Sequence, residues 1–349
     1  MKKCKVYVIP FLAVFCVMFA QCRKSDSPPN YSGLWQKLNT PYFGNISDIQ
    51  FTSCDTGYII GYDTTVPVGT NIIKTFDGGR TWQKIYFLPS VPTSAVIKPI
   101  GPLYVSPFNS NILISECYGS TKIVRSTDGG YHWKIIDSTQ SPAAWGKYHF
   151  FSPANVLRSG EFIYASTDSG FTWSKVYDSQ GGFAFFTMLQ FTNNQVGYTS
   201  GGISFDGNDG GMMAKTTDGG NTWQPVNYPF YNILGMSFIN DNTGYVVMDR
   251  DPESNNGQYS VLYKTQDGGI TWNAVNKSLN WGGYDLYFRN EQDGFTYGLG
   301  GIYHTTNGGT TWQNEFPAIR ANSITNLYFP NPSCCYAIDE QGNVYKRTF

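Results

Sequence analysis

Charge and histidine are scarce in this chain of 349 residues. Only 14% of the residues are charged, with 24 Lys and Arg against 25 Asp and Glu. A formal net charge of −1 gives no indication of a nucleic-acid partner, which would call for a basic surface. The histidines His132, His149 and His304 have no i,i+4 spacing, and no phosphate-binding glycine motif precedes a helix. We therefore expect no metal ion and no cofactor.

Long hydrophobic runs are also missing, except near the N-terminus. Residues 7–20 form a mostly apolar run behind a short basic start, too short to span a bilayer and typical of a signal peptide. The run ends Ala20-Gln21-Cys22, which resembles the lipobox of bacterial lipoproteins, although Gln21 stands where Gly, Ala or Ser is typical.

The lipobox resemblance implies cleavage before Cys22 and lipidation of its sulfur. Residues 1–21 would then be a lipoprotein signal peptide and residues 22–30 a polar tether. We expect an exported lipoprotein of the outer membrane or the periplasm-facing cell envelope, which meets the membrane through its lipid anchor only. The alternative is an ordinary secretory signal followed by an incidental cysteine.

Glycine and aromatic residues are abundant. The chain contains 38 Gly, 25 Tyr, 24 Phe and 9 Trp, and 41% of its residues are hydrophobic. This composition excludes intrinsic disorder and favours strands and turns over helices.

Six segments repeat one pattern, and we call them the box turns. Each has Ser or Thr two residues before an Asp or Asn, Gly two residues after it and Trp five residues after it. The Asp or Asn residues are Asp77, Asp128, Asp168, Asp218, Asp267 and Asn307, and the tryptophans are Trp82, Trp133, Trp173, Trp223, Trp272 and Trp312. A short side-chain oxygen can accept hydrogen bonds from turn N–H groups, and glycine permits the positive φ of a tight hairpin. We therefore predict a structural role for these residues and assign no catalytic residue.

The box turns resemble the Asp-box, or bacterial neuraminidase repeat. Their tryptophans lie 40 to 51 residues apart, and a Gly-aromatic strand such as the one at Gly57-Tyr58 precedes several of them. A repeat of about 46 residues is typical of a four-stranded propeller blade. The C-terminus stops where a seventh box turn would begin, and residues 34–38 match the strand that follows one. We predict an all-β, seven-bladed β-propeller over residues 31–349, with its last blade closed by the N-terminal strand.

Two cysteines, Cys54 and Cys334, fall in corresponding turns of the first and last predicted blades, which are adjacent across the predicted ring closure. An oxidising compartment would permit a disulfide between them. The sequence does not give the separation that a disulfide requires, so free buried thiols are the favoured interpretation.

Over nearly the whole mature chain the sequence resembles the photosystem II stability/assembly factor family. The resemblance rests on a Gly-Tyr strand followed by Lys or Arg, Thr or Ser, one further residue and Asp-Gly-Gly-x-Thr-Trp, as in residues 244–272. It implies a non-catalytic binding or scaffold module. We expect a monomer that binds a protein or glycan of the envelope.

We expect ligands on the face formed by the loops between second and third strands and between successive blades. The candidate residues are Trp145, Lys147, Tyr148, Phe183, Tyr231, Arg250, Trp281, Tyr284 and Arg320. Aromatic side chains with a few charges suit a protein or glycan surface. The alternative is that most of these aromatic residues fill the central channel.

The alternative function is a glycoside hydrolase of the sialidase-like or glucanase-like propeller type. A sialidase needs an arginine cluster, and only Arg250 and Arg320 are expected on the binding face. A hydrolase with two carboxylates would have to use loop acids, of which the candidates are Asp63, Asp206, Asp251 and Glu253.

Overall fold

The computed structural model describes residues 34–41, 45–63, 69–89, 99–117, 122–137, 146–178, 184–205, 208–227, 231–250, 260–316 and 324–349. The chain divides into residues 1–30 and residues 31–349, and the first unit lies outside the described residues. Cys22 and the tether therefore lie outside them, as do Trp145, Phe183 and Arg320. The described part of the chain contains no helix with the length and hydropathy needed to cross a membrane.

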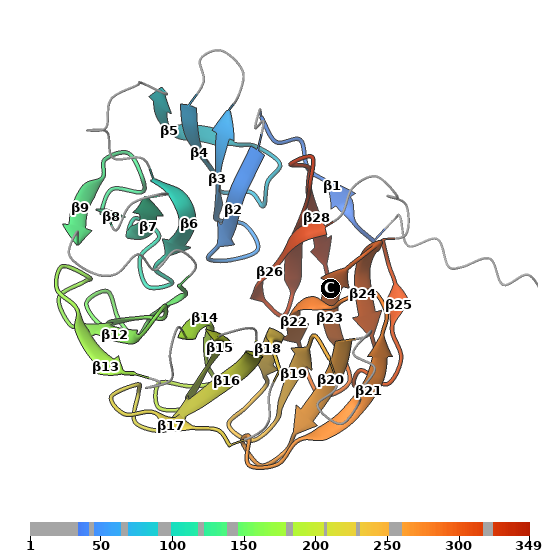
Figure 1. The fold of residues 1–349 in the computed structure, drawn as a ribbon. Coiled ribbons are helices and arrows are strands. Elements are labelled where there is room, and N and C mark those ends of the chain that lie inside the picture. Colours follow the sequence, from blue (N-terminus) through green and yellow to red (C-terminus); the bar gives the residue numbers. More distant parts are fainter. Residues whose placement is uncertain are drawn as a thin grey trace, which may run out of the picture. The chain divides into compact units, whose positions relative to one another are not determined.

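Within residues 31–349, the described strands form seven four-stranded antiparallel sheets arranged as blades in a ring (Figure 1). This arrangement confirms the predicted all-β propeller. Within a blade the strands follow the chain from the channel outward, and the last strand lies at the rim.

Blades one to three follow one another along the chain. Blade one holds β2 (Asn45–Phe51), β3 (Gly57–Asp63), β4 (Gly69–Thr75) and β5 (Gln83–Pro89). Blade two holds β6 (Pro99–Val105), β7 (Leu113–Cys117), β8 (Ile123–Ser126) and β9 (Lys134–Asp137). Blade three holds β10 (Tyr148–Phe150), β11 (Val156–Arg158), β12 (Ile163–Ser166) and β13 (Ser174–Tyr177).

Blades four to six repeat the same order. Blade four holds β14 (Ala184–Phe191), β15 (Gly197–Phe205), β16 (Asn208–Thr216) and β17 (Gln224–Pro225). Blade five holds β18 (Ile233–Phe238), β19 (Gly244–Met248), β20 (Ser260–Thr265) and β21 (Asn273–Leu279). Blade six holds β22 (Tyr284–Phe288), β23 (Gly294–Gly298), β24 (Gly301–Thr305) and β25 (Gln313–Asn314).

Blade seven joins the two ends of the propeller. It holds β26 (Ile324–Asn331), β27 (Cys334–Asp339), β28 (Val344–Thr348) and, at the rim, β1 (Gln36–Lys37). Gln36 pairs with Lys346, and the side chains of Trp35 and Leu38 on either side of β1 are buried. The N-terminal strand closes the last blade, as predicted.

The core lies between neighbouring blades. Each of the seven clusters of buried apolar side chains among the described residues draws on two successive blades. The cluster between blades seven and one, for example, packs Tyr336 and Ile338 against Ile49 and Phe51. Each blade is therefore stabilised by its neighbours, and the ring depends on the contact between its first and last blades.

Four tyrosines in the second strands also connect the blades. Each donates its hydroxyl to a backbone carbonyl in the turn after the first strand of the next blade, at 2.6 to 2.9 Å, and each lies under a lysine ammonium from its own third strand. The pairs are Tyr58 with Lys74, Tyr198 with Lys215, Tyr245 with Lys264, and Tyr336 with Lys346. The Gly-Tyr and Lys-Thr parts of the repeat therefore act together at the contacts between blades.

The box turns close the hairpins between third and fourth strands. In all six, the Ser or Thr hydroxyl donates to the Asp or Asn side chain at 2.8 to 3.0 Å. The same hydroxyl accepts the N–H of the glycine four residues later, whose φ lies between +86° and +96°. A β-carbon would be disfavoured at that φ, so the glycine is required by the turn.

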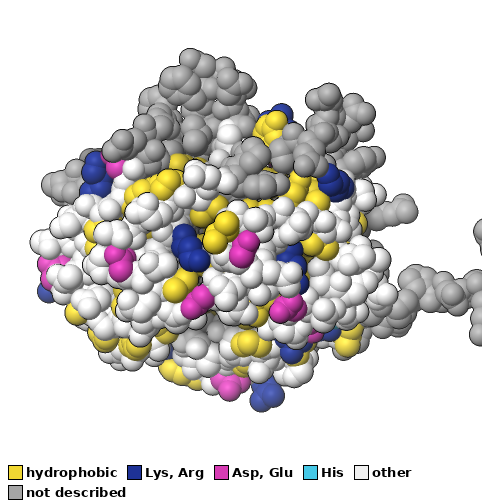
Figure 2. Space-filling model, turned by 90° about the horizontal axis from the view of Figure 1, so that it is seen from below, with side chains coloured by type: hydrophobic (Ala, Val, Ile, Leu, Met, Phe, Trp, Pro, Cys, Tyr) yellow, Lys and Arg dark blue, Asp and Glu magenta, His cyan; other side chains and the backbone are white. Residues whose placement is uncertain are grey.

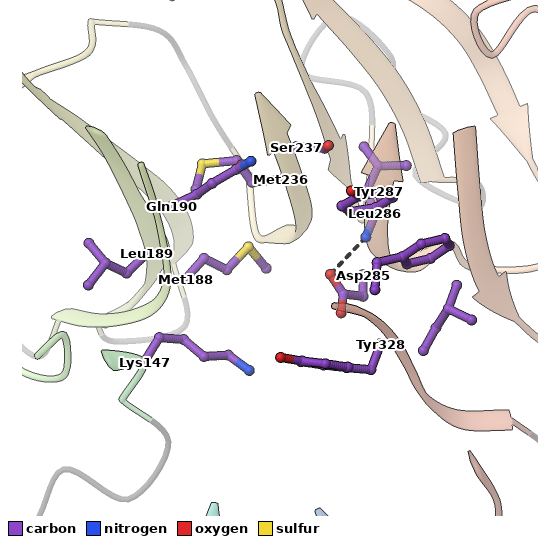
Figure 3. Close-up of a pocket in the computed structure, with 12 residues that line it drawn as sticks. Lys147, Met188, Leu189, Gln190, Met236, Ser237, Asp285, Leu286, Tyr287 and Tyr328 are labelled. Carbon is purple, nitrogen blue, oxygen red and sulfur yellow. Dashed lines mark hydrogen bonds between the residues drawn. The ribbon is translucent and has the colours of Figure 1, made fainter. Parts of the chain in front are cut away.

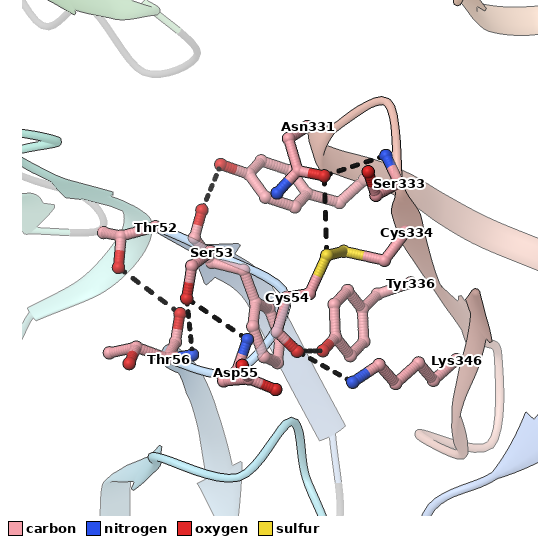
Figure 4. Close-up of a disulfide and its surroundings, with 12 residues drawn as sticks. Thr52, Ser53, Cys54, Asp55, Thr56, Asn331, Ser333, Cys334, Tyr336 and Lys346 are labelled. Atoms are coloured by element: carbon pink, nitrogen blue, oxygen red, sulfur yellow. Dashed lines mark hydrogen bonds between the residues drawn. A yellow bond between two sulfur atoms is a disulfide. The ribbon is translucent and has the colours of Figure 1, made fainter. Parts of the chain in front are cut away.

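A disulfide joins Cys54, in the turn after β2, to Cys334, the first residue of β27 (Figure 4). Their Cα atoms are 5.9 Å apart, within the usual range for a disulfide. The sequence-based preference for free thiols is wrong for this pair, because ring closure brings the two turns together. Tyr336 and Lys346 both donate to the Cys54 carbonyl, at 2.8 and 2.7 Å, so the disulfide lies within the contact between blades seven and one.

Candidate functional site: the central channel

The first strand of each blade lies next to the channel (Figure 1). The pairing registers show a β-bulge or irregularity in most of these strands. The register shifts between Ile46 and Asp48 in β2, and the strands β14 and β18 shift at corresponding places. Irregularities also occur in β6, β22 and β26. A bulge bends the strand and redirects the side chains next to it. The side chains that point into the channel therefore do not follow the regular alternation of a strand.

In blades one to six, the strand registers place one residue of each blade at the same level of the channel, three positions before the last pair of the first hairpin. These residues are Asp48, Pro102, Lys147, Met188, Gly235 and Asp285. Three of them carry a charge, in a chain where charge is scarce. Lys147 is among the residues predicted on the binding face, and the two aspartates are not.

A cavity of about 300 Å³ opens at this level (Figure 3). It is lined by Lys147, Met188, Leu189, Gln190, Met236, Ser237, Asp285, Leu286, Tyr287, Leu327, Tyr328 and Phe329. These residues come from blades three to seven, so the cavity exists only in the closed ring. It is mostly apolar with a few polar groups, as small-molecule sites are.

Several polar side chains of the cavity are occupied by backbone groups of a neighbouring blade. The Gln190 amide donates to the Phe238 carbonyl at 2.9 Å and accepts the Phe238 N–H at 2.8 Å. The Ser237 hydroxyl oxygen accepts the Phe288 N–H at 2.9 Å, and the Tyr328 hydroxyl donates to the Phe51 carbonyl at 3.1 Å. These groups hold the blades together and leave little capacity for a ligand.

Asp48 is buried and has partners for both carboxylate oxygens. One oxygen accepts the Ile49 N–H at 2.8 Å, and the other accepts the Leu103 N–H of blade two at 2.9 Å. Burial raises the pKa of Asp48, while the charge of Lys147 and these hydrogen bonds oppose the rise. We assign Asp48 a structural role between blades one and two.

Asp285 and Lys147 are less constrained. Both side chains are exposed to the channel and project into the cavity from different blades (Figure 3). One Asp285 oxygen accepts the Leu286 N–H at 2.8 Å. The surrounding blades displace solvent from Asp285 and raise the pKa of its carboxyl, although the charge of Lys147 partly offsets this.

The loop before β22 positions Asp285 in an unusual conformation. Gly282 and Gly283 have φ of +98° and +74°, and Asp285 itself has φ of +53°. The Thr296 hydroxyl donates to the Asp285 carbonyl at 2.7 Å. A Cβ added to Gly235 in blade five would lie 2.7 Å from the Asp285 carbonyl carbon, so that glycine lets the two backbones approach.

The described residues that were predicted on the binding face lie at three different locations: between two blades, beside an arginine, and around a glycine loop. Tyr148 packs between blades two and three, 4.5 Å from the Tyr104 ring, so it is a packing residue. Tyr231 lies under the Arg250 guanidinium at 4.5 Å. Trp281 and Tyr284 flank the glycine loop of blade six, where Trp281 stacks on a neighbouring ring and Tyr284 is 47% exposed.

A second group of ionisable side chains lies between blades six and seven, away from the cavity. His304 contacts Glu315 at 2.7 Å and Asp293 at 3.3 Å, and Arg347 pairs with Glu315. Burial lowers the pKa of His304. Because Arg289 also pairs with Asp293, the acids of this group are neutralised within it, and the group belongs to the contact between the two blades.

The described acids offer no pair for general acid and base catalysis in the channel. Asp48 has both oxygens occupied by N–H donors, which leaves Asp285 by itself. The described residues also contain no group of three or more His, Cys, Asp and Glu arranged to hold a metal ion. The side chains of the loop acids Asp63, Asp206, Asp251 and Glu253 lie outside the described residues.

On the side of the molecule shown in Figure 2, the described residues form no large surface of one charge. Figure 2 shows Lys and Arg side chains interspersed with Asp and Glu on the face that it presents. Such a surface does not favour a polyanionic partner over others.

Comparisons with known proteins agree with the fold. The family Sortilin-Vps10, described as "Sortilin, neurotensin receptor 3", matches residues 161–297, less than half of the chain. No curated protein matches the sequence.

Several solved structures share the architecture. YCF48 bound to D1 peptide has a TM-score of 0.64 at 18% identity, covering 90% of this chain and 97% of its own. YCF48 from Cyanidioschyzon merolae has a TM-score of 0.62 at 16% identity, covering 90% and 98%. A catalytically inactive virginiamycin B lyase from Staphylococcus aureus with quinupristin has a TM-score of 0.64 at 13% identity, covering 90% and 99%. At these identities, the likenesses show that the chain has a β-propeller fold.

Proposed function

We propose that this protein is a non-catalytic binding propeller of the bacterial cell envelope, anchored through a lipid on Cys22. The partner is a protein or a glycan, held on the face where the first strands begin. The observation that carries the proposal is the aromatic surface of that face over blades five and six. Among the described residues, the acids of the channel form no pair for catalysis.

The aromatic surface consists of Tyr231, Trp281, Tyr284 and Tyr303, with Arg250 over the Tyr231 ring; Tyr284 is exposed, and the other three rings are half-buried. Leu299 is 67% exposed in the adjacent turn between β23 and β24. Exposed aromatic and apolar side chains next to an arginine are typical of binding surfaces. The YCF48 structure with a bound D1 peptide supports a peptide segment as one kind of partner for this fold.

The anchoring is supported by the sequence and by the disulfide. Residues 7–22 resemble a lipoprotein signal with its lipidated cysteine. The Cys54–Cys334 disulfide fits an oxidising compartment such as the periplasm. Metabolic labelling with a fatty acid should mark the wild type and not the Cys22→Ala variant. Equal labelling of both would contradict the anchor.

The binding role is tested by affinity capture from the organism's own membranes. The wild type should retain a partner that the double variant Trp281→Ala, Tyr284→Ala releases. An Ile270→Ala variant in the box turn of blade five is the matched control and should behave as the wild type. Turnover of a sialoside or a β-glucan that is lost on mutating one loop acid would support the glycoside hydrolase instead.

A further inference from the structure

The central cavity holds two opposite charges that remain available to a ligand. The Lys147 ammonium makes no hydrogen bond or ion pair with a residue in the described ranges, and one Asp285 oxygen is equally uncommitted there. Both side chains project into the same cavity (Figure 3). The amide of Gln190 and the hydroxyl of Tyr328, by contrast, are bonded to backbone groups.

The rest of the cavity wall is mainly apolar. Met188, Met236, Leu286 and Leu327 contribute to it, and the two methionine side chains can adjust to ligands of different shape. A volume of about 300 Å³ is at the lower end of the range for small-molecule sites. The cavity therefore suits a small molecule that has an apolar part and two opposite charges.

We propose that the cavity binds an α-amino acid with an apolar side chain, whose carboxylate pairs with Lys147 and whose ammonium pairs with Asp285. The apolar side chain lies against Met188 and Met236. This site lies in the channel and does not include the aromatic surface over blades five and six, so it does not depend on the macromolecular partner proposed above.

The conformation of Asp285 supports a ligand-binding role. Positive φ is uncommon for a residue other than glycine, although Asp adopts it more readily than most, and the surrounding structure has to hold it. Here the flanking glycines, the Thr296 hydroxyl and the close approach at Gly235 together hold the carboxylate in the channel wall. The charge of Asp48, on the other hand, is satisfied by N–H donors and needs no further partner.

The ligand chemistry is tested by calorimetric titration of the full mature chain with four probes. L-Leucine and L-methionine should bind. N-acetyl-L-leucine, which lacks the ammonium, and L-leucinamide, which lacks the carboxylate, should each bind at least tenfold more weakly. No binding of either amino acid, or equal affinity for leucine and its two derivatives, would overturn the proposal.

The assignment to this cavity is tested with Lys147→Met and Asp285→Asn. Asparagine tolerates positive φ and keeps the acceptor for the Leu286 N–H, so the second variant should fold normally. Each variant should weaken leucine binding at least tenfold. The exposed ion pair between Lys175, on β13, and Asp178, just after it, provides the controls Lys175→Met and Asp178→Asn, which should bind leucine as the wild type does. Undiminished binding by a folded Asp285→Asn variant would place the ligand elsewhere.

Discussion

At each box turn, one side chain satisfies hydrogen-bond donors that a tight hairpin would otherwise leave unpaired. One Asp218 oxygen accepts the Thr216 hydroxyl and the Thr222 N–H, and the other accepts the Thr222 hydroxyl. Asn307 reproduces this with an amide, whose NH₂ donates to the Thr311 hydroxyl. The role therefore requires an acceptor oxygen at a fixed place and does not require a charge.

Replacing Asp218 tests this account of the turn. Asp218→Ala removes three hydrogen bonds and should lower the free energy of unfolding by about 1–3 kcal/mol. Asp218→Asn should lower it by less than about 1 kcal/mol, since the amide can take the same partners. Urea denaturation compares the two variants with the wild type. Equal stability of the Ala and Asn variants would contradict a specific acceptor role.

The tryptophan of the same turn has a different role. Trp223 is 5% exposed and packs in the cluster between blades three and four, and its indole N–H donates to the Gly220 carbonyl at 3.1 Å. Trp223→Ala should cost about 3–5 kcal/mol, because it removes a large buried side chain. A loss smaller than that of Asp218→Ala, measured under the same conditions, would show that the ring is not a main contact between the blades.

The hydrogen bonds in the box turns also lead us to expect that the folded protein loses stability in acid. Hydrogen bonds from the threonine four residues later lower the pKa of Asp77, Asp168 and Asp267 from 3.8 to about 2. A carboxylate with a lowered pKa in the folded state contributes stability above its unfolded pKa, and this is lost as the pH falls from about 4 to about 2. Asp48 and Asp285, whose pKa values are raised, act in the opposite direction.

We therefore expect the melting temperature to fall between pH 5 and pH 2.5, because the turns outnumber the two channel acids. Differential scanning calorimetry across this range gives the measurement. A melting temperature that is constant or rises as the pH falls would show that the aspartates of the turns do not stabilise the folded state.

At the scale of strands and blades, the sequence predicts what repeats and misses what does not. The box turns, the Gly-Tyr strands and the seven four-stranded blades all follow from spacing. Alternation within a strand does not give the side-chain directions in the channel, because bulges in the first strands interrupt it. Alignment of the repeats at Phe51, Phe150 and Phe288 would have placed Asp48, Lys147 and Asp285 together.

The strand that closes the ring is the element whose removal is most informative. Deleting residues 31–40 removes β1, exposes the edge of β28 and takes Trp35 and Leu38 out of two core clusters. An unpaired edge with exposed apolar surface promotes association, so we expect aggregation or a large fall in melting temperature. The matched deletion of residues 23–30 should leave the fold intact. A soluble, cooperatively melting 31–40 deletion with the stability of the wild type would contradict ring closure by β1.

At the scale of the whole molecule, the two ends of the ring have different structures. Antiparallel order places the box turns and the turns after the first strands, including the Cys54–Cys334 disulfide, at one end. The other end carries the aromatic surface of blades five and six and the segments that lead into the first strand of each blade. The sequence placed Cys54 and Cys334 in adjacent blades of the closed ring but did not give the separation of their Cα atoms, so it could not decide between a disulfide and free thiols.

The central functional claim is that a partner binds the aromatic end of the ring. A photo-crosslinking amino acid at position 284 is compared with the same residue at position 270, which is 78% exposed in a box turn at the opposite end. Irradiation of the full chain in its native envelope should give one discrete adduct from position 284 and none from position 270. Equal adducts from both positions, or a discrete adduct from position 270 alone, would contradict the account.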